Sequence, residues 1–198
     1  MAESSMYHAG SRALQDRFDS RRIADRLEQV TVHTELTESD VVFVTRASMF
    51  FLATTDADGW PDCSYKGGLP GFVAVLDSST LAFPSYDGNG MFRSLGNIEV
   101  NPRVGMLFID FEHASRMRVN GIASIHVDDE LLRGFDGAQV VVRVHIERIF
   151  PNCPRYIHRM KLLEHSIYAP APGRVPPEPD WKRSEEFRDA LPGAGAEP

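Results

Sequence analysis

The chain has 198 residues, of which 42% are hydrophobic, and a formal net charge of −7. This length and composition predict one globular domain with a sizeable core and argue against general disorder. The negative charge makes nucleic acid or an anionic membrane an unfavourable partner. The two cysteines, Cys63 and Cys153, form no metal-binding spacing and no disulfide framework. No apolar run is long enough to span a bilayer and no basic-then-apolar leader follows Met1, so we expect a cytoplasmic protein.

The first 36 residues predict a helical arm. Two segments have the spacing of short helices, Ser11–Phe18 and Ser20–Val30. In the second segment the apolar residues Ile23, Leu27 and Val30 form a stripe, with charges elsewhere. We expect this arm either to lie on the outside of the core or to reach across to a second subunit.

A main domain is expected to span residues 37–165. Thr37-Glu38-Ser39-Asp40 resembles a capping box in which Asp replaces the usual Glu, which predicts a helix that runs to about Arg46. Residues 166–198 are polar and rich in proline, so we expect an extended tail there, pinned by Trp181 and Phe187.

β-prone runs dominate the main domain. Turn signals such as Asp56-Ala57-Asp58-Gly59 separate them, and Gly121 inside one run is expected at a bulge. Strands at such short spacing, without regular helices between them, favour an antiparallel barrel over a parallel α/β sheet. The six or seven runs are Met49–Thr54, Trp60–Lys66, Phe72–Leu76, Leu81–Phe83, Val104–Ile109, Arg116–Val127 and Ala138–Ile149.

Two segments near the end of the domain are expected to be helical. They are Asp128–Phe135, with Asp128 as its cap, and Arg155–Leu163. His158 and His165 would share a face of the second helix, but helical histidines are more often packing or surface residues than ligands. Because no histidine pair has metal-binding spacing, we predict no metal site.

A glycine-rich turn precedes another predicted helix. Asp87-Gly88-Asn89-Gly90 is a strong turn signal, because Gly and Asn tolerate positive φ. Met91–Ile98 follows with helical spacing and with Met91 on its apolar side. The turn thus presents the start of a helix beside Arg93 and Ser94. Free N–H groups, the helix dipole, a guanidinium and a hydroxyl together suit a phosphate. An ordinary loop with a solvated arginine is the alternative.

Two further stretches carry cations on strands. In Cys63-Ser64-Tyr65-Lys66-Gly67-Gly68, alternation places Ser64 and Lys66 on one face, and the glycines let another group approach the backbone closely. Arg116 and Arg118 share one face of a later strand. The alternative for both stretches is that these cations simply point to water.

No residue is a convincing general acid or base. Asp110, Glu112 and His113 imitate an acid–base set, but they stand at a strand end, where charges are commonly solvated. The chain contains no nucleophile elbow, no Walker loop and no dinucleotide fingerprint after a strand. Catalytic residues therefore stay unassigned.

Taken in order, three stretches resemble the FMN-binding split barrel of the pyridoxamine 5′-phosphate oxidase-like family. They are WPDCSYKGGLPGFV, LAFPSYDGNGMFRSLGNIEVNPRVGMLFID and SRMRVNGIASI, within about Thr37 to Tyr156. The segment IFPNCPRYIH resembles one that follows the last barrel strand in a broad branch of that family. The resemblance implies a mainly β fold, a six-stranded antiparallel split barrel with peripheral helices. It also implies a homodimer with two FMN molecules at the subunit interface.

By matching position, the resemblance implies which residues bind the cofactor. Lys66 falls where the family's phosphate- or ring-contacting lysine ends its strand. Arg116 and Arg118 match the region that approaches the flavin, often from the partner subunit. The others are Ser64 and Tyr65 along the cofactor, Asn89, Met91, Arg93 and Ser94 at the phosphate-binding turn and helix, and Arg155 and Tyr156 as weaker candidates for closing the pocket.

The end of the chain departs from the true pyridoxamine 5′-phosphate oxidases. It reads SEEFRDALPGAGAEP and lacks their Arg-x-His substrate motif. The resemblance therefore supports the cofactor better than a vitamin B6 substrate. We expect an FMN-dependent oxidoreductase that exchanges a hydride between flavin N5 and a small organic substrate. The alternative is a non-catalytic sensor or carrier that binds flavin, the deazaflavin F420 or haem.

Overall fold

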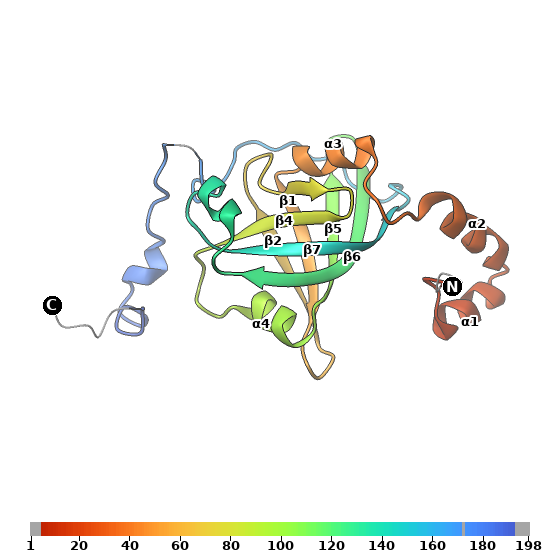
Figure 1. Cartoon of the computed structure of the whole chain (residues 1–198), viewed down its shortest axis with the longest axis horizontal. Helices are drawn as coiled ribbons and strands as arrows, with labels where there is room; N and C mark the ends of the chain where they lie inside the picture. Colours follow the sequence, from red (N-terminus) through yellow and green to blue (C-terminus); the bar gives the residue numbers. More distant parts are fainter. Residues whose placement is uncertain (1–4, 172, 193–198) are drawn as a thin grey trace.

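The computed structural model describes residues 5–171 and 173–192. The strands occupy its centre, the α1–α2 arm lies at one end and the C-terminal segment at the other (Figure 1). The helices are α1 (Ala9–Arg17), α2 (Arg21–Thr31), α3 (Glu38–Arg46) and α4 (Arg93–Val100), with 3₁₀ turns η1 (Glu130–Gly134) and η2 (Asp180–Arg183). The strands are β1 (Met49–Thr55), β2 (Pro61–Gly67), β3 (Ala74–Asp77), β4 (Thr80–Tyr86), β5 (Arg103–Asp110), β6 (Ser115–His126) and β7 (Ala138–Pro151).

The strands form one antiparallel sheet of seven strands, in the order β2-β1-β5-β6-β7-β4-β3. It is strongly curved but not closed, and β2 and β3 are its edges, as expected for a split barrel (Figure 1). The predicted antiparallel, mainly β architecture is confirmed, with the short β3 as the seventh strand. The predicted bulge also lies where expected, because the β6–β7 register shifts between Asn120 and Gly121. A Cβ at Gly121 would come within 2.3 Å of the His145 carbonyl oxygen, so no larger residue fits there.

Phenylalanine rings cluster within the largely aliphatic core inside the curved sheet. Phe50 of β1 is fully buried, and its ring centroid lies 5.9, 5.0 and 5.1 Å from those of Phe72, Phe83 and Phe108. Helix α3 closes one side of this core with the fully buried Val44. Its predicted capping box is present, with the Thr37 hydroxyl and the Asp40 carboxylate each accepting a backbone N–H of the other residue.

The two predicted N-terminal helices are present near their expected bounds, as α1 and α2. The apolar residues of the arm stay largely exposed, with Ile23 at 56% and Val30 at 71%. A short bridge between His33 and Ile149 of β7 joins the arm to the sheet. In the part of the chain that the structure describes, no helix is long and apolar enough to cross a membrane.

The predicted helix Arg155–Leu163 is wrong. The segment is irregular after a turn at Arg155 and Tyr156, and its Met160 N–H donates to the Phe111 carbonyl at the β5–β6 turn. Tyr156 is 88% exposed and Leu163 93% exposed, so a helix here would have no buried apolar face to stabilise it. His158 and His165 consequently share no helix face.

The predicted helix Asp128–Phe135 is a shorter 3₁₀ turn, η1. Its cap is Asp129 and not Asp128, because the Asp129 carboxylate accepts the Leu131 N–H at 2.9 Å. The same carboxylate also accepts two hydrogen bonds from Arg143 of β7, which tie η1 to the sheet.

Candidate functional site

Three polar side chains share the inner face of the edge strand β2. Asp62, Ser64 and Lys66 pair with Thr54, Leu52 and Phe50 of β1, whose side chains point into the core. Cross-strand partners lie on the same face of a sheet. The polar row therefore continues the core-facing surface to the edge of the sheet, where it is half-buried.

Helix α4 packs over this row and is tied to it by hydroxyl and amide groups. Ser94, itself buried, lies with its hydroxyl 2.9 Å from that of Ser64 and donates to the Asp62 carboxylate at 3.4 Å. One turn later, the Asn97 amide donates to the buried Thr54 hydroxyl at 3.0 Å. These contacts fix the first turn of α4 beside β2.

The start of α4 has no side-chain cap. Its N-cap, Phe92, has a left-handed backbone (φ 47°, ψ 29°), and no side chain accepts the first N–H groups of the helix. Before it, the Asn89 side chain accepts the Met91 N–H at 3.1 Å, which shapes the predicted turn. Met91 was predicted on the apolar side of the helix, but it precedes the helix and is 64% exposed. The first turn of α4 therefore offers free N–H donors next to Arg93.

The two cations near this helix start have no partner among the described residues. Lys66 and Arg93 make no hydrogen bond and no ion pair there, and Arg93 is exposed. Burial lowers the pKa of the Lys66 ammonium, and the negative charge of Asp62 opposes that shift. An anion beside Lys66 would compensate the lost hydration of the ammonium.

A cleft of about 1190 Å³ opens in front of these groups. Its walls are the inner face of β2, the loop between β4 and α4, the start of α4 and a part of the C-terminal tail. Six residues predicted for the site line it together: Ser64, Lys66, Asn89, Met91, Arg93 and Ser94. The volume is sufficient for a cofactor-sized ligand, since such pockets typically measure about 300–1,000 Å³.

The tail residues of the cleft were not predicted as site residues. Trp181, Lys182 and Phe187 line it beside Tyr86 and Phe92. The signal in the sequence was the pair of aromatic residues in an otherwise polar, proline-rich tail, which predicted an anchor but not its location.

Comparison with known proteins identifies the domain that carries this cleft. Residues 36–153 match the family model described as pyridoxamine 5′-phosphate oxidase. The chain belongs to this family. The match covers β2 with its polar row, the neighbouring β1, the glycine-rich turn and α4. No curated protein matches the chain.

Several solved structures have a similar fold. HupZ from Group A Streptococcus is 23% identical and matches 59% of this chain and 93% of its own, with a TM-score of 0.48. A "putative pyridoxamine 5′-phosphate oxidase" from Lactobacillus delbrueckii is 28% identical over 60% of this chain and 95% of its own, with a TM-score of 0.49. HutZ, the heme storage protein from Vibrio cholerae, is 22% identical over 59% and 94%, with a TM-score of 0.44.

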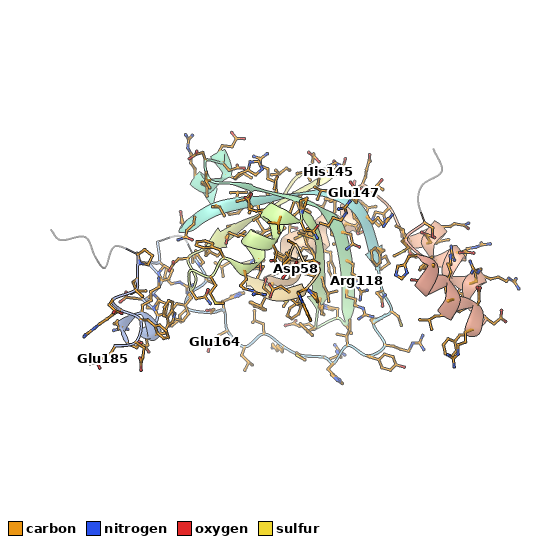
Figure 2. All side chains as sticks on the ribbon, turned by 90° about the horizontal axis from the view of Figure 1, so that it is seen from below. Asp58, Arg118, His145, Glu147, Glu164 and Glu185 are labelled. Carbon is orange, nitrogen blue, oxygen red and sulfur yellow. The ribbon has the colours of Figure 1, made fainter. Side chains whose placement is uncertain are left out.

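Three residues that the family resemblance assigns to the cofactor lie outside the cleft of their own chain. Tyr65 points to the other face of β2, where its ring meets Phe51 edge-on at 6.1 Å. Arg116 donates to the side chain of Asn152 and to the Cys153 carbonyl. Arg118 lies over the Phe150 ring at 5.9 Å, and Figure 2 shows it toward the arm end of the sheet, away from the tail residue Glu185.

The remaining candidates and the two glycines also have local roles. Arg155 donates to the Cys153 sulfur at 3.3 Å, and neither Arg155 nor Tyr156 lines the cleft. The glycines after Lys66 admit two aromatic rings of the same chain. A Cβ at Gly67 would lie 2.6 Å from the Tyr65 ring, and one at Gly68 would lie 2.6 Å from Phe72.

Proposed function

We propose that the chain binds FMN in this cleft and acts as an FMN-dependent oxidoreductase on a small organic substrate. The observation that carries the proposal is the convergence of Lys66 and Arg93, both without a partner in the described chain, at the uncapped start of α4. A dianionic phosphate matches this set of donors.

The rest of the cleft also fits FMN. Tyr86, Phe92 and Trp181 provide apolar surface for a flat ring system. None of the histidines in the described residues lines the cleft, and histidine is a common axial ligand of haem iron. The cations and free N–H groups at the start of α4 suit the phosphate of FMN, a group that haem lacks. When bound, FMN supplies hydride exchange at its N5 atom, whereas Lys66, Arg93, Ser64 and Ser94 would hold its phosphate.

Titration of the purified protein with FMN, followed by flavin fluorescence, tests the proposal. Lys66→Met is expected to weaken binding about ten- to a hundredfold, because a charge-assisted hydrogen bond contributes roughly 1.5–3 kcal/mol. Lys161→Met, which removes an exposed lysine outside the cleft, is the matched control and should leave the affinity unchanged. A wild-type protein that takes up no FMN, or equal losses in both variants, would overturn the assignment.

Turnover separates the enzyme from a carrier that binds the same cofactor. We expect the bound flavin to be reduced by at least one donor among NAD(P)H, reduced F420 and pyridoxamine 5′-phosphate. Reduction by dithionite alone would favour the non-catalytic binding module.

We further propose that the chain forms a homodimer with the cofactor at the interface. The support is a row of side chains on the outer face of the sheet, paired strand by strand. Its members are Tyr65, Phe51, Leu107, Arg118 and Phe150. In this proposal Arg116 and Arg118 of one copy serve the cleft of the other copy. Phe51→Glu should give a monomer in sedimentation velocity, and a wild-type monomer would contradict the proposal.

A further inference from the structure

Part of the C-terminal tail folds against the cleft. Residues 178–192 turn back on themselves, with the Ser184 N–H donating to the Trp181 carbonyl at 3.2 Å and the Phe187 N–H to the Ser184 carbonyl at 3.3 Å. These turns bring the rings of Trp181 and Phe187 together edge-on, with centroids 5.9 Å apart. The tail thus presents a compact aromatic pair to the cleft.

An ion pair holds this part of the tail at the loop that leads into α4. The Lys182 ammonium donates to the Asp87 carboxylate, across 95 positions of sequence. The Lys182 side chain is only 19% exposed, which is unusual for a lysine in a terminal segment. The same ammonium lies 5.8 Å from the Trp181 ring centroid, so the ion pair also fixes the position of the indole.

The chemistry of the cleft is therefore divided. Lys66 and Arg93 offer positive charge without partners, whereas the tail offers aromatic surface that remains partly exposed, with Trp181 at 37% and Phe187 at 51%. A ligand with an anionic group and a flat ring matches both parts at once. FMN has this composition, so the inference rests on the function proposed above.

We propose that residues 178–192 form the ring-binding wall of the cleft. Trp181 is its contact residue, and the Asp87–Lys182 pair, here called the latch, positions it. The ligand would then contact two segments that are distant in sequence, and its affinity would depend on residues outside the part of the chain that matches the family model.

The two tryptophans of the chain provide a matched pair for the contact role. Trp181→Ala is expected to weaken FMN binding about two- to tenfold, the range of an aromatic contact. Trp60→Ala removes a 72% exposed indole at the β1–β2 turn and should leave the affinity unchanged. Equal affinities for wild type and Trp181→Ala would overturn the contact role.

Asp87→Asn tests the latch, because two explanations of the role of Asp87 predict opposite changes in FMN affinity. If Asp87 acted only through its charge, removing a negative group from the cleft would strengthen the binding of an anion. Loss of the latch instead releases Trp181 and weakens FMN binding severalfold, which is the expected result. The double variant Asp87→Lys/Lys182→Asp restores an ion pair at the same net charge and should recover much of the affinity. Stronger binding by Asp87→Asn would overturn the latch.

A readout without ligand separates this proposal from the cofactor assignment. In a Trp60→Phe background Trp181 is the single tryptophan, and acrylamide quenching of its fluorescence should increase when Asp87→Asn is added. Unchanged quenching would overturn the latch whether or not FMN binds. If the wild type binds no FMN while quenching responds to Asp87→Asn, the tail docks as proposed but the FMN assignment and the ring-binding role both fail.

Discussion

Strands β1 and β2 are neighbours with aligned residues, but their inner faces have opposite characters. β1 contributes Phe50 and Leu52, both fully buried, to the core. Directly across, β2 contributes the half-buried Lys66 and Ser64. The difference arises from position, because β1 has a strand on each side, whereas β2 is an edge with α4 over it.

One sheet face can therefore serve both stability and binding. The apolar row of β1 stabilises the fold by excluding water. The polar row of β2 keeps its charge because the edge of the sheet leaves space for a ligand. Substitutions in the β1 row should therefore lower the free energy of unfolding, and substitutions in the β2 row should lower ligand affinity.

The largest effect is expected for Phe50→Ala. Phe50 contacts three buried aromatic rings, so its truncation leaves a cavity and should lower the free energy of unfolding by about 3–5 kcal/mol. Urea denaturation measures the change. Phe18→Ala, which removes a 71% exposed ring at the C-cap of α1, is the control and should be nearly neutral. A loss below about 1 kcal/mol for Phe50→Ala would contradict the assignment of this row to the core.

Much of this arrangement could be predicted from the sequence, because local patterns encode it. Alternation places Ser64 and Lys66 on one face, and the glycine-rich turn predicts the helix start beside Arg93 and Ser94. The cleft brings all four together. The tail could not be placed, because its contact depends on the Asp87–Lys182 pair, which joins segments far apart in the chain. Tyr156 shows the opposite error, since helical spacing predicted a helix where no buried face supports one.

Asn97→Ala is expected to affect both rows, because Asn97 joins α4 to β1. The variant leaves the buried Thr54 hydroxyl without its donor, which should cost about 1–3 kcal/mol of stability. FMN affinity should fall as well, because α4 carries Arg93 and Ser94. The double variant Thr54→Val/Asn97→Leu replaces both partners by apolar groups and should recover part of the stability. If it recovers none, the cost comes from packing and not from the hydrogen bond.

Ser64→Ala should have a smaller effect, confined to the polar row. It removes the hydroxyl that lies 2.9 Å from that of Ser94, and a neutral hydrogen bond contributes roughly 0.5–1.5 kcal/mol. We expect FMN affinity to fall about two- to tenfold. The free energy of unfolding should fall by roughly 0.5–1.5 kcal/mol. Isothermal titration and urea denaturation measure the two quantities. Ser124→Ala on β6, outside the cleft, is the control. Unfolding of Ser64→Ala under native conditions would show that the polar row is part of the core.

The pH dependence of stability gives the finest test, because it isolates the charge of Lys66. Burial lowers the pKa of Lys66 in the folded state below its ordinary value of 10.5. At pH values between the lowered pKa of the folded state and the ordinary 10.5 of the unfolded chain, the unfolded chain binds more protons than the folded one. The free energy of unfolding therefore rises with pH across that window. Lys66→Met lacks the titrating group. The free energy of unfolding of the wild type relative to this variant should therefore increase as the pH rises toward 10.5. Saturating FMN should reduce the increase, since a phosphate beside the ammonium raises its pKa again. An increase that FMN leaves unchanged would place the phosphate away from Lys66, and the polar row would then be a buried charge without the binding role that distinguishes it from β1.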